Sequence, residues 1–452
     1  MLREQIDQLK PFQARAIIEE LRKGSVPVEY VAFFTVGRQN WLTFIEDDLD
    51  HYIAEGGAKV RFIVGDYGDG KTHFMSVIRH MALQKGFAVS FVVLTREVPM
   101  QKFEVVYREI ARQLKVPETL PGSSEGSGAM RVEETGIRGL LADWIESAAP
   151  GLTTLGAVAS GNSSLQDRLA VLREELGGLP GMDVNFANGL IGLLDNRLRP
   201  LAEGETADER AASREILHQW FEGGKVAKKD LRPFQIFEVL NKTNSKSFLG
   251  SLLAFLKYLG CKGLILLMDE LETIVAQSAS VRGAAYENVR LLIDNSEQAR
   301  YLHIFFSIIP DVILSEKGFK SYDALWSRVR SIGEGKRLNY RSILIDLHRT
   351  PLEIHELTEL GLALKSIHEI SYRWQAGEQV GEELIARICE TQKRMGLLSE
   401  VRLFIKQVIR VLDMAEQGIP LDERLDLTEQ ILAGSREMEE EKMEQMQPRW
   451  DA

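Results

Sequence analysis

The octapeptide Gly65-Asp66-Tyr67-Gly68-Asp69-Gly70-Lys71-Thr72 decides how the rest of this sequence is interpreted. It matches G-x-x-x-x-G-K-[ST], a loop whose backbone N–H groups cradle the phosphates of a nucleoside triphosphate. The apolar residues 60–64 before it predict a strand, and residues 72–83 after it predict a helix. This order suits phosphate binding, because the positive end of the helix dipole then faces the anion. We therefore predict a nucleotide site in which Lys71 reaches the β- and γ-phosphates and the Thr72 hydroxyl ligates Mg²⁺.

Composition places the chain among globular proteins. Its 452 residues leave room for two or three domains, and its 44% hydrophobic and 27% charged residues are ordinary for a soluble protein. No apolar run approaches the ~20 residues that a membrane helix needs. The only cysteines, Cys261 and Cys389, support neither a disulfide framework nor a cysteine zinc site. We expect a cytoplasmic protein that makes no membrane contact.

The net charge of −11 argues against broad attraction to nucleic acid. It still leaves room for a local basic patch.

Strands and helices alternate along the chain, which indicates the fold class. Residues 87–94 predict a buried strand and residues 103–114 a helix, so strand, helix, strand, helix follow one another. This pattern indicates an α/β protein with a parallel sheet and crossover helices. Apolar runs at 264–268, 302–307 and 342–347 predict further strands of the same sheet.

Changes in composition divide the chain into six segments. Glycine and serine at 121–128 predict a flexible loop at the start of a helical insertion, which is the natural place for partner specificity. The predicted segments are 1–35, N-terminal and helical; 36–116, the first half of the nucleotide-binding core; 117–232, the mainly helical insertion; 233–350, the second half of the core; 351–416, a helical lid; and 417–452, a charged helical tail.

Hydrolysis needs an acid that organises the metal and a group that aligns water. The apolar strand at 264–268 ends in Asp269 and Glu270, which places both carboxylates at the sheet edge where the phosphate loop lies. We expect Asp269 to hold the magnesium shell and Glu270 to orient or deprotonate the attacking water. The alternative is a buried strand that meets a solvated acidic turn.

Three other side chains are candidates for the nucleotide site, and each also has an ordinary structural explanation. Ser307 ends the next strand, either between the acidic pair and the γ-phosphate or as a cap of the turn before Pro310. Arg328 could reach the γ-phosphate of a neighbouring subunit, with Arg330 as a rival, or form a surface salt bridge. Arg402 points off the apolar stripe of its helix and is either a phosphate contact or an exposed arginine.

His73, in the first turn of the helix after the loop, is a further candidate for nucleotide contact. A histidine that packs in a partly buried position is its alternative. The histidines show no metal-ligand spacing, so magnesium is the only metal we expect.

These pieces in this order resemble AAA+ ATPases, particularly the branch of the origin-recognition initiators. The resemblance implies a three-layer α/β/α ATPase domain with a helical lid. It assigns residues 65–72 to Walker A, residues 264–270 to Walker B, Ser307 to sensor 1, Arg328 to the arginine finger and Arg402 to sensor 2. Val36, Gly37 and Arg38 resemble the segment that packs near adenine. The chain ends soon after the lid, so the winged helix of origin initiators is not expected.

A closer resemblance is to the ATP-binding proteins of BREX-type phage-defence loci called BrxD. It is carried by residues 14–24, 35–38, 68–74, 268–272, 285–288 and 325–328. It implies ATP and Mg²⁺ as cofactors and other defence-system proteins as partners, such as a helicase or a methyltransferase. DNA contact, direct or through a partner, and a homo-oligomer that forms on ATP or partner binding are also implied.

Three functions compete at this point. The first is an ATP-hydrolysing AAA+ protein that controls a DNA-acting partner by assembly or conformational change. The second is a nucleotide switch or scaffold that hydrolyses slowly and recruits partners through the insertion. The third is a DNA-loading initiator, which needs a positive surface that the net charge disfavours.

Overall fold

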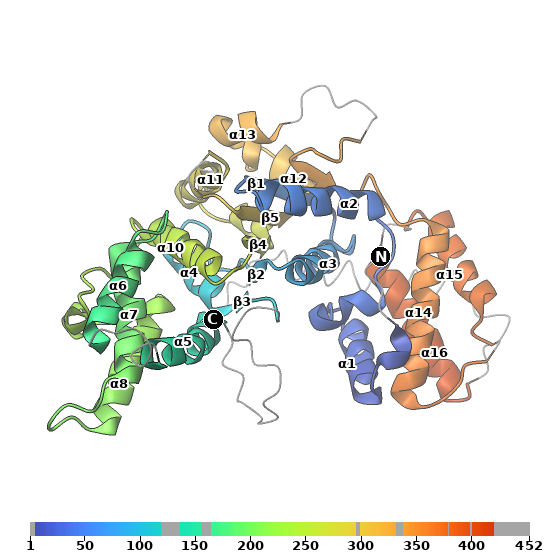
Figure 1. Ribbon diagram of the computed structural model, residues 1–452. Helices are drawn as coiled ribbons and strands as arrows, with labels where there is room; N and C mark the ends of the chain where they lie inside the picture. Colours follow the sequence, from blue (N-terminus) through green and yellow to red (C-terminus); the bar gives the residue numbers. More distant parts are fainter. Residues whose placement is uncertain are drawn as a thin grey trace, which may run out of the picture.

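The computed structural model describes residues 5–118, 136–154, 164–294, 299–330, 338–377, 379–397 and 400–419 (Figure 1). The glycine- and serine-rich loop predicted at 121–128 lies outside the described residues, as does the charged tail from residue 420 onward.

A six-stranded sheet with the order β3-β2-β4-β5-β1-β6 forms the centre of the molecule. Every neighbouring pair is parallel except β2 and β3, which are antiparallel. The predicted α/β class with a parallel sheet is therefore confirmed. The strands are β1 (Ala58–Val64), β2 (Ala88–Val93), β3 (Leu114–Lys115), β4 (Leu264–Asp269), β5 (Leu302–Ile308) and β6 (Leu344–Asp346).

The two central strands are buried along their whole length. All residues of β4 and β5 are buried, because helices cover both faces of the sheet. This is why these strands are continuous apolar runs rather than alternating patterns.

Sixteen α-helices surround the sheet within the described part of the chain. Their bounds are α1 (Pro11–Arg22), α2 (Gln39–Asp48), α3 (Lys71–Gln84), α4 (Phe103–Arg112), α5 (Gly136–Thr154), α6 (Leu165–Gly177), α7 (Val184–Leu198), α8 (Ala207–Phe221), α9 (Lys228–Leu231), α10 (Ser245–Tyr258), α11 (Ala279–Asp294), α12 (Pro310–Leu314), α13 (Asp323–Val329), α14 (Ile354–Tyr372), α15 (Glu382–Arg394) and α16 (Val401–Glu416).

One helix prediction was wrong at its carboxyl end. The helix predicted to run to residue 114 stops at Arg112, and Leu114 instead pairs with Ser90 of β2. Pairing with the sheet edge overrides local helix propensity at this end. Helix α2 is followed directly by a π-helical turn, Leu49–Ile53.

The sheet separates two hydrophobic cores. On one face Leu264, Leu266 and Met268 of β4 pack with α4, α10, α11 and the helices α5 to α8. On the other face Ile265 and Leu267 pack with α2, α3 and the carboxyl-terminal helices. This alternation along a single strand fixes which helices lie on which side.

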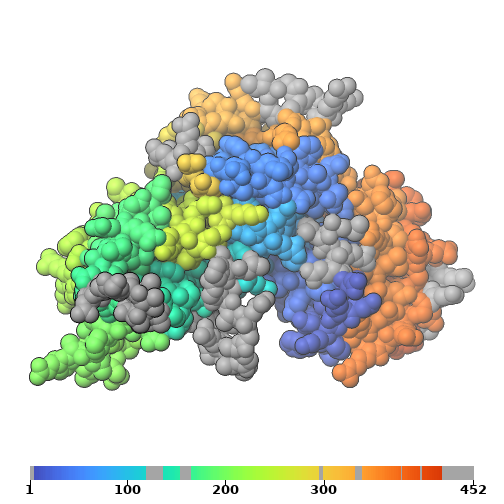
Figure 2. All heavy atoms as spheres, viewed as in Figure 1, coloured from blue at the N-terminus to red at the C-terminus, as the bar shows by residue number. Residues whose placement is uncertain are grey.

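Helices from opposite ends of the chain meet beside the sheet. α1 packs against α14 and α16, and these helices lie on the opposite side of the molecule from α5 to α8 (Figure 1). In the space-filling view, the green residues of α5 to α8 and the orange carboxyl-terminal helices form opposite ends of the molecule (Figure 2). Among the described helices, none combines the length and the apolar character needed to span a membrane.

Candidate nucleotide site

The phosphate loop connects β1 to the first residue of α3. Gly68 and Gly70 have φ angles of +96° and +85°, a left-handed conformation that glycine adopts without steric cost. Lys71 begins α3, and its Nζ donates hydrogen bonds to the carbonyl oxygens of Gly65 at 2.9 Å and Asp66 at 3.1 Å. Burial lowers the pKa of Lys71, while neighbouring carboxylates oppose this shift. The ammonium group is therefore held inside the loop.

The end of β4 lies against the first turn of α3. The Thr72 hydroxyl donates a hydrogen bond to Oδ2 of Asp269 at 2.7 Å. The other oxygen, Oδ1, accepts hydrogen bonds from the Ser307 hydroxyl and, at 3.0 Å, from the backbone N–H of Glu270. β5 lies between β4 and β1 in the sheet, so Ser307 reaches Asp269 from the neighbouring strand. Three predicted site residues thus form one hydrogen-bonded cluster.

Glu270 follows directly and is turned toward the loop by an unusual backbone conformation. Its φ of +62° is left-handed, which is uncommon for a residue with a side chain. Its N–H donates to the Ser307 hydroxyl oxygen at 3.0 Å, which helps to hold this conformation. Burial raises the pKa of Glu270, and the charge of Asp269 raises it further.

Glu272 belongs to the same cavity and was not predicted as a site residue. It lies in a short 3-10 turn, Leu271–Ile274, and lines the cavity with Lys71 and Glu270. Burial raises its pKa to about 7, although the charge of Lys71 opposes this, and its Oε2 has no hydrogen-bond partner among the described groups. The sequence shows a third carboxylate two positions after Glu270, but only the turn brings it back toward the loop.

The segment before the loop forms another wall. Val36, Gly37 and Arg38 all line the cavity. Gly37 has a φ of +69°, and a Cβ there would lie 2.4 Å from Cδ2 of Leu352. Arg38 donates from Nη2 to the carbonyl of Asp69 at 2.5 Å, and burial lowers its pKa to about 10. Arg38 therefore ties this wall to the loop.

His73 faces the same wall. Its Nε2 lies 3.2 Å from Oγ1 of Thr35, whose own proton goes to the carbonyl of Val31 at 2.6 Å. The hydroxyl oxygen must then accept, so Nε2 carries the imidazole proton. Burial lowers the pKa of His73 to about 4, so the ring is neutral near pH 7.

Helices α1, α14 and α16 close the cavity on the side away from the sheet. The turn after α1 contributes Gly24 and Val26, α14 contributes Leu360, and α16 contributes Arg402 and Ile405. A Cβ on Gly24 would lie 3.4 Å from Cδ of Arg402, so the arginine stem runs along this turn. Arg402 and the phosphate loop thus line one cavity although they are far apart in the sequence.

The two arginines near the end of α13 lie elsewhere. Arg328 pairs with Asp294 at the end of α11 through its Nε and through its Nη2, the latter at 2.8 Å. Arg330 is exposed. Neither is among the described residues that line the cavity of their own chain.

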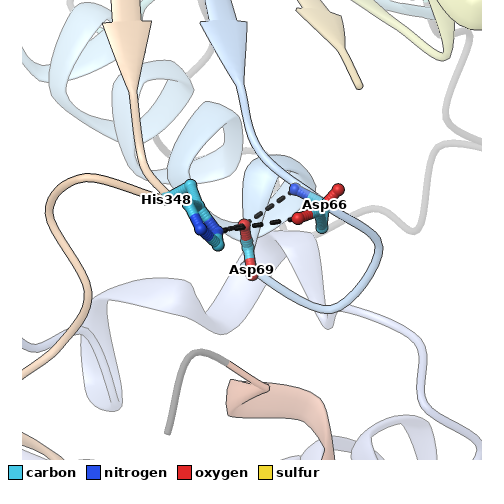
Figure 3. Close-up of side chains that lie close together, drawn as sticks. All are labelled: Asp66, Asp69 and His348. Atoms are coloured by element: carbon cyan, nitrogen blue, oxygen red, sulfur yellow. Dashed lines mark hydrogen bonds and ion pairs between the residues drawn. The ribbon is translucent and has the colours of Figure 1, made fainter. Parts of the chain in front are cut away.

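The rim of the loop carries a cluster that the sequence did not indicate. Oδ2 of Asp69 accepts the Asp66 N–H at 2.7 Å, and Nδ1 of His348 lies 3.6 and 3.7 Å from the carboxylates of Asp66 and Asp69 (Figure 3). The three potential ligand atoms lie within 4.8 Å of one another, which is close enough for a cation. The Asp69 carboxylate already stabilises the loop by accepting one of its N–H groups.

This fold and cavity define an α/β protein whose phosphate loop faces two acidic residues across the sheet edge. Residues 9–430 match the family model of the BREX system ATP-binding proteins BrxC/D, so the chain belongs to that family. A search of curated proteins found no match. The predicted membership of a BREX ATP-binding family is therefore confirmed, and this membership supports ATP as the ligand and a BREX system as the setting.

Proposed function

We propose that the chain is a Mg²⁺-dependent ATPase of the AAA+ type. In this proposal, nucleotide-driven assembly or conformational change controls a partner that acts on DNA in the BREX system. The observation that carries it is the 2.7 Å hydrogen bond between the Thr72 hydroxyl and Asp269. It joins the helix after the phosphate loop to the acid at the end of β4, the two groups expected to share a metal ion.

The residues around this bond fit magnesium. Mg²⁺ takes oxygen ligands and commonly uses one or two carboxylates together with substrate phosphates. Thr72 and Asp269 supply a hydroxyl and a carboxylate at the mouth of the loop, and Ser307 fixes the carboxylate from behind. When bound, the ion would neutralise charge on the phosphate oxygens.

Protein side chains would contact the phosphates and activate the attacking water. Lys71 would leave the carbonyls of Gly65 and Asp66 to contact the β- and γ-phosphates, which replace those weak acceptors with strong ones. Glu270 would accept a proton from, or orient, the attacking water, and burial raises its pKa, which makes the carboxylate a stronger proton acceptor.

The sheet order supports the AAA+ assignment. β5, which ends near Ser307, lies between the acidic strand β4 and the loop strand β1, as a sensor 1 role requires. Arg402 on α16 lines the cavity from the lid, as a sensor 2 role requires. Val36, Gly37 and Arg38 are then the wall for the adenine base. A cytoplasmic location stays a prediction from the sequence.

The test compares phosphate release from ATP by the wild type and by Glu270→Gln, with ATP binding measured separately. We expect the variant to bind ATP normally and to lose about 100-fold or more in turnover, because only the group that aligns water is changed. Glu316→Gln, an exposed glutamate outside the cavity, is the matched control. Equal turnover in wild type and Glu270→Gln would refute the assignment.

One observation favours a slow nucleotide switch as the second candidate. Arg328 is paired with Asp294, so in an isolated chain this arginine lies away from the phosphates of ATP bound in the cavity of the same chain. Turnover by a lone subunit would then be slow until a neighbour or a partner supplies the missing charge.

A further inference from the structure

One stretch of the insertion is positively charged within an acidic chain. Residues 225–246, here called the cationic segment, contain six lysines and arginines but only two acidic residues, while the whole chain carries −11. The segment spans α9 and leads into α10. Five of its cations have exposed side chains: Lys225, Lys228, Lys229, Arg232 and Lys242.

Among the described residues, these five cations have no internal partner, unlike Arg138, Arg199 and Arg210 of the same insertion. Arg138 contacts Glu215 and Glu222 at 2.8 and 3.0 Å, and Arg199 and Arg210 both contact Glu205. Within the described part of the chain, by contrast, none of the five exposed cations makes an ion pair or a side-chain hydrogen bond. Their charge is therefore available to an external anion.

The backbone beneath these charges is held firmly. Leu231 and Ile236 are fully buried in the core of the insertion. The Trp220 indole donates to the carbonyl of Glu238 at 2.8 Å, and the Asn188 amide donates to that of Gln235 at 2.9 Å. A preorganised backbone reduces the ordering cost of binding, although the lysine side chains remain free.

The two ends of the segment approach each other. A Cβ on Gly223 would lie 2.4 Å from Cδ2 of Leu240, so the chain near Lys225 runs close to the chain near Lys242. Between them Phe237 is 64% exposed, with its N–H bonded to Oδ1 of Asn185 at 2.8 Å. An exposed aromatic ring therefore lies between the cations at the two ends of the cationic segment.

We propose that the cationic segment is a DNA-binding surface that contacts the phosphate backbone, with Phe237 against a sugar or an unstacked base. Four of the unpaired cations lie within eight residues, at 225, 228, 229 and 232, and such a concentration of positive charge suits a polyanion. Aromatic rings among cations are typical of backbone-tracking nucleic-acid sites. The cations are lysines and one arginine on an exposed surface rather than on an inserted recognition helix, so binding is independent of sequence.

The surface is also connected to the nucleotide site. α10 follows the segment directly and leads into β4, whose last residue is Asp269. Just before the amino-terminal end of the segment, Nε of Arg108 on α4 donates to the carbonyl of Gly223 at 2.5 Å. The DNA surface goes beyond the proposed ATPase activity, and its binding is measured without ATP, so the two proposals can fail separately.

The experiment measures binding of the full chain to fluorescein-labelled duplex and single-stranded DNA at about 50 to 200 mM salt. The test variant is Lys228→Gln with Lys229→Gln and Arg232→Gln. We expect about tenfold or greater loss of affinity and a salt dependence that is shallower by about three, since each lost phosphate contact removes about 0.9 from the slope. Phe237→Ala should weaken binding to single strands more than binding to duplex.

Lys393→Gln with Arg394→Gln on α15 is the control, because it removes exposed positive charge from the lid. Thermal melting establishes that each variant is folded. Loss of affinity in the insertion variant but not in the lid variant supports the proposal. It is overturned if the wild type does not bind DNA, if both variants lose affinity equally, or if anionic lipid vesicles or polyglutamate bind the segment as tightly as DNA.

Discussion

At the scale of single residues, Glu272 has the clearest physical consequence. It is a carboxylic acid in the nucleotide cavity whose burial raises its pKa to about 7 from an ordinary 4.5, despite the nearby charge of Lys71. Between these two pH values, the folded chain keeps a proton that the unfolded chain releases. The folded state then binds more protons, so this group makes the free energy of unfolding fall as pH rises from about 4.5 to about 7.

We expect Glu272→Gln to remove this pH dependence. The variant should be more stable than the wild type above pH 7, by up to about 3 kcal/mol, and equal to it near pH 4.5. The measurement is the melting temperature of both proteins across this range. Glu97→Gln changes an exposed glutamate, and its melting temperature should differ from that of the wild type by the same amount at every pH. A constant difference for Glu272→Gln would contradict the assigned burial.

The sequence locates individual residues where a motif dictates the backbone. The glycine spacing around Lys71 places its ammonium group and the Thr72 hydroxyl, and an apolar strand places Asp269 at the sheet edge. Glu272 and His348 could not be found in this way, because a 3-10 turn and the end of β6 bring them to the loop. Such approaches depend on tertiary structure rather than on local spacing.

At the scale of elements, a polar cluster joins α1 to the carboxyl-terminal helices. Arg22 on α1 donates to Asp413 on α16 at 2.7 Å and to the hydroxyl of Tyr372 at 3.1 Å. Nε2 of the fully buried His368 lies 3.0 Å from the same carboxylate, and Nδ1 accepts from the Trp374 indole at 2.9 Å. The helices that carry the turn at 24–26 and Arg402 are therefore connected at a single carboxylate.

We expect Asp413→Ala to loosen this connection. It leaves the His368 N–H without its acceptor and Arg22 without its strongest partner, at a cost of about 1–3 kcal/mol in the free energy of unfolding. ATP affinity should fall as well, since two walls of the cavity lose their common anchor. Calorimetric melting and ATP titration measure both effects. Glu416→Ala, at an exposed position of the same helix, should leave both unchanged, and a similar loss there would contradict this role.

Element prediction worked where apolar periodicity was long and failed where short pairings decide the ends. The segment predicted to be helical at 1–35 contains α1, whose buried residues Ala14, Ile17, Ile18 and Leu21 have helical spacing. The edge strand β3 was missed because two residues carry no period, and only the antiparallel partner β2 defines it. The packing of α1 on α14 and α16 is equally invisible, because it joins segments more than 300 residues apart.

At the scale of the whole molecule, the position of Arg328 bears on assembly. Its pairing with Asp294 keeps it on the outer side of α11 and α13 rather than in the cavity. If it acts as a finger, it must act on a neighbouring chain after this pair opens. The chain alone is then incomplete for fast hydrolysis.

We expect ATP turnover to rise more than linearly with protein concentration. Glu270→Gln and Arg328→Ala should each be nearly inactive alone but should recover activity when mixed, because each supplies what the other lacks. Phosphate release from the mixture measures this, and Arg330→Ala in place of Arg328→Ala identifies which arginine acts. A mixture as inactive as its components would exclude a finger supplied in trans.

Binding of a non-hydrolysable ATP analogue, measured by calorimetry with and without Mg²⁺, tests the central claim most directly. That claim is that Thr72 and Asp269 form the metal-binding edge of an ATP site. The account predicts that Mg²⁺ strengthens binding to the wild type by about tenfold or more, equivalent to about 1.4 kcal/mol, and has little effect in Asp269→Asn. An equal effect of Mg²⁺ in both proteins would contradict it.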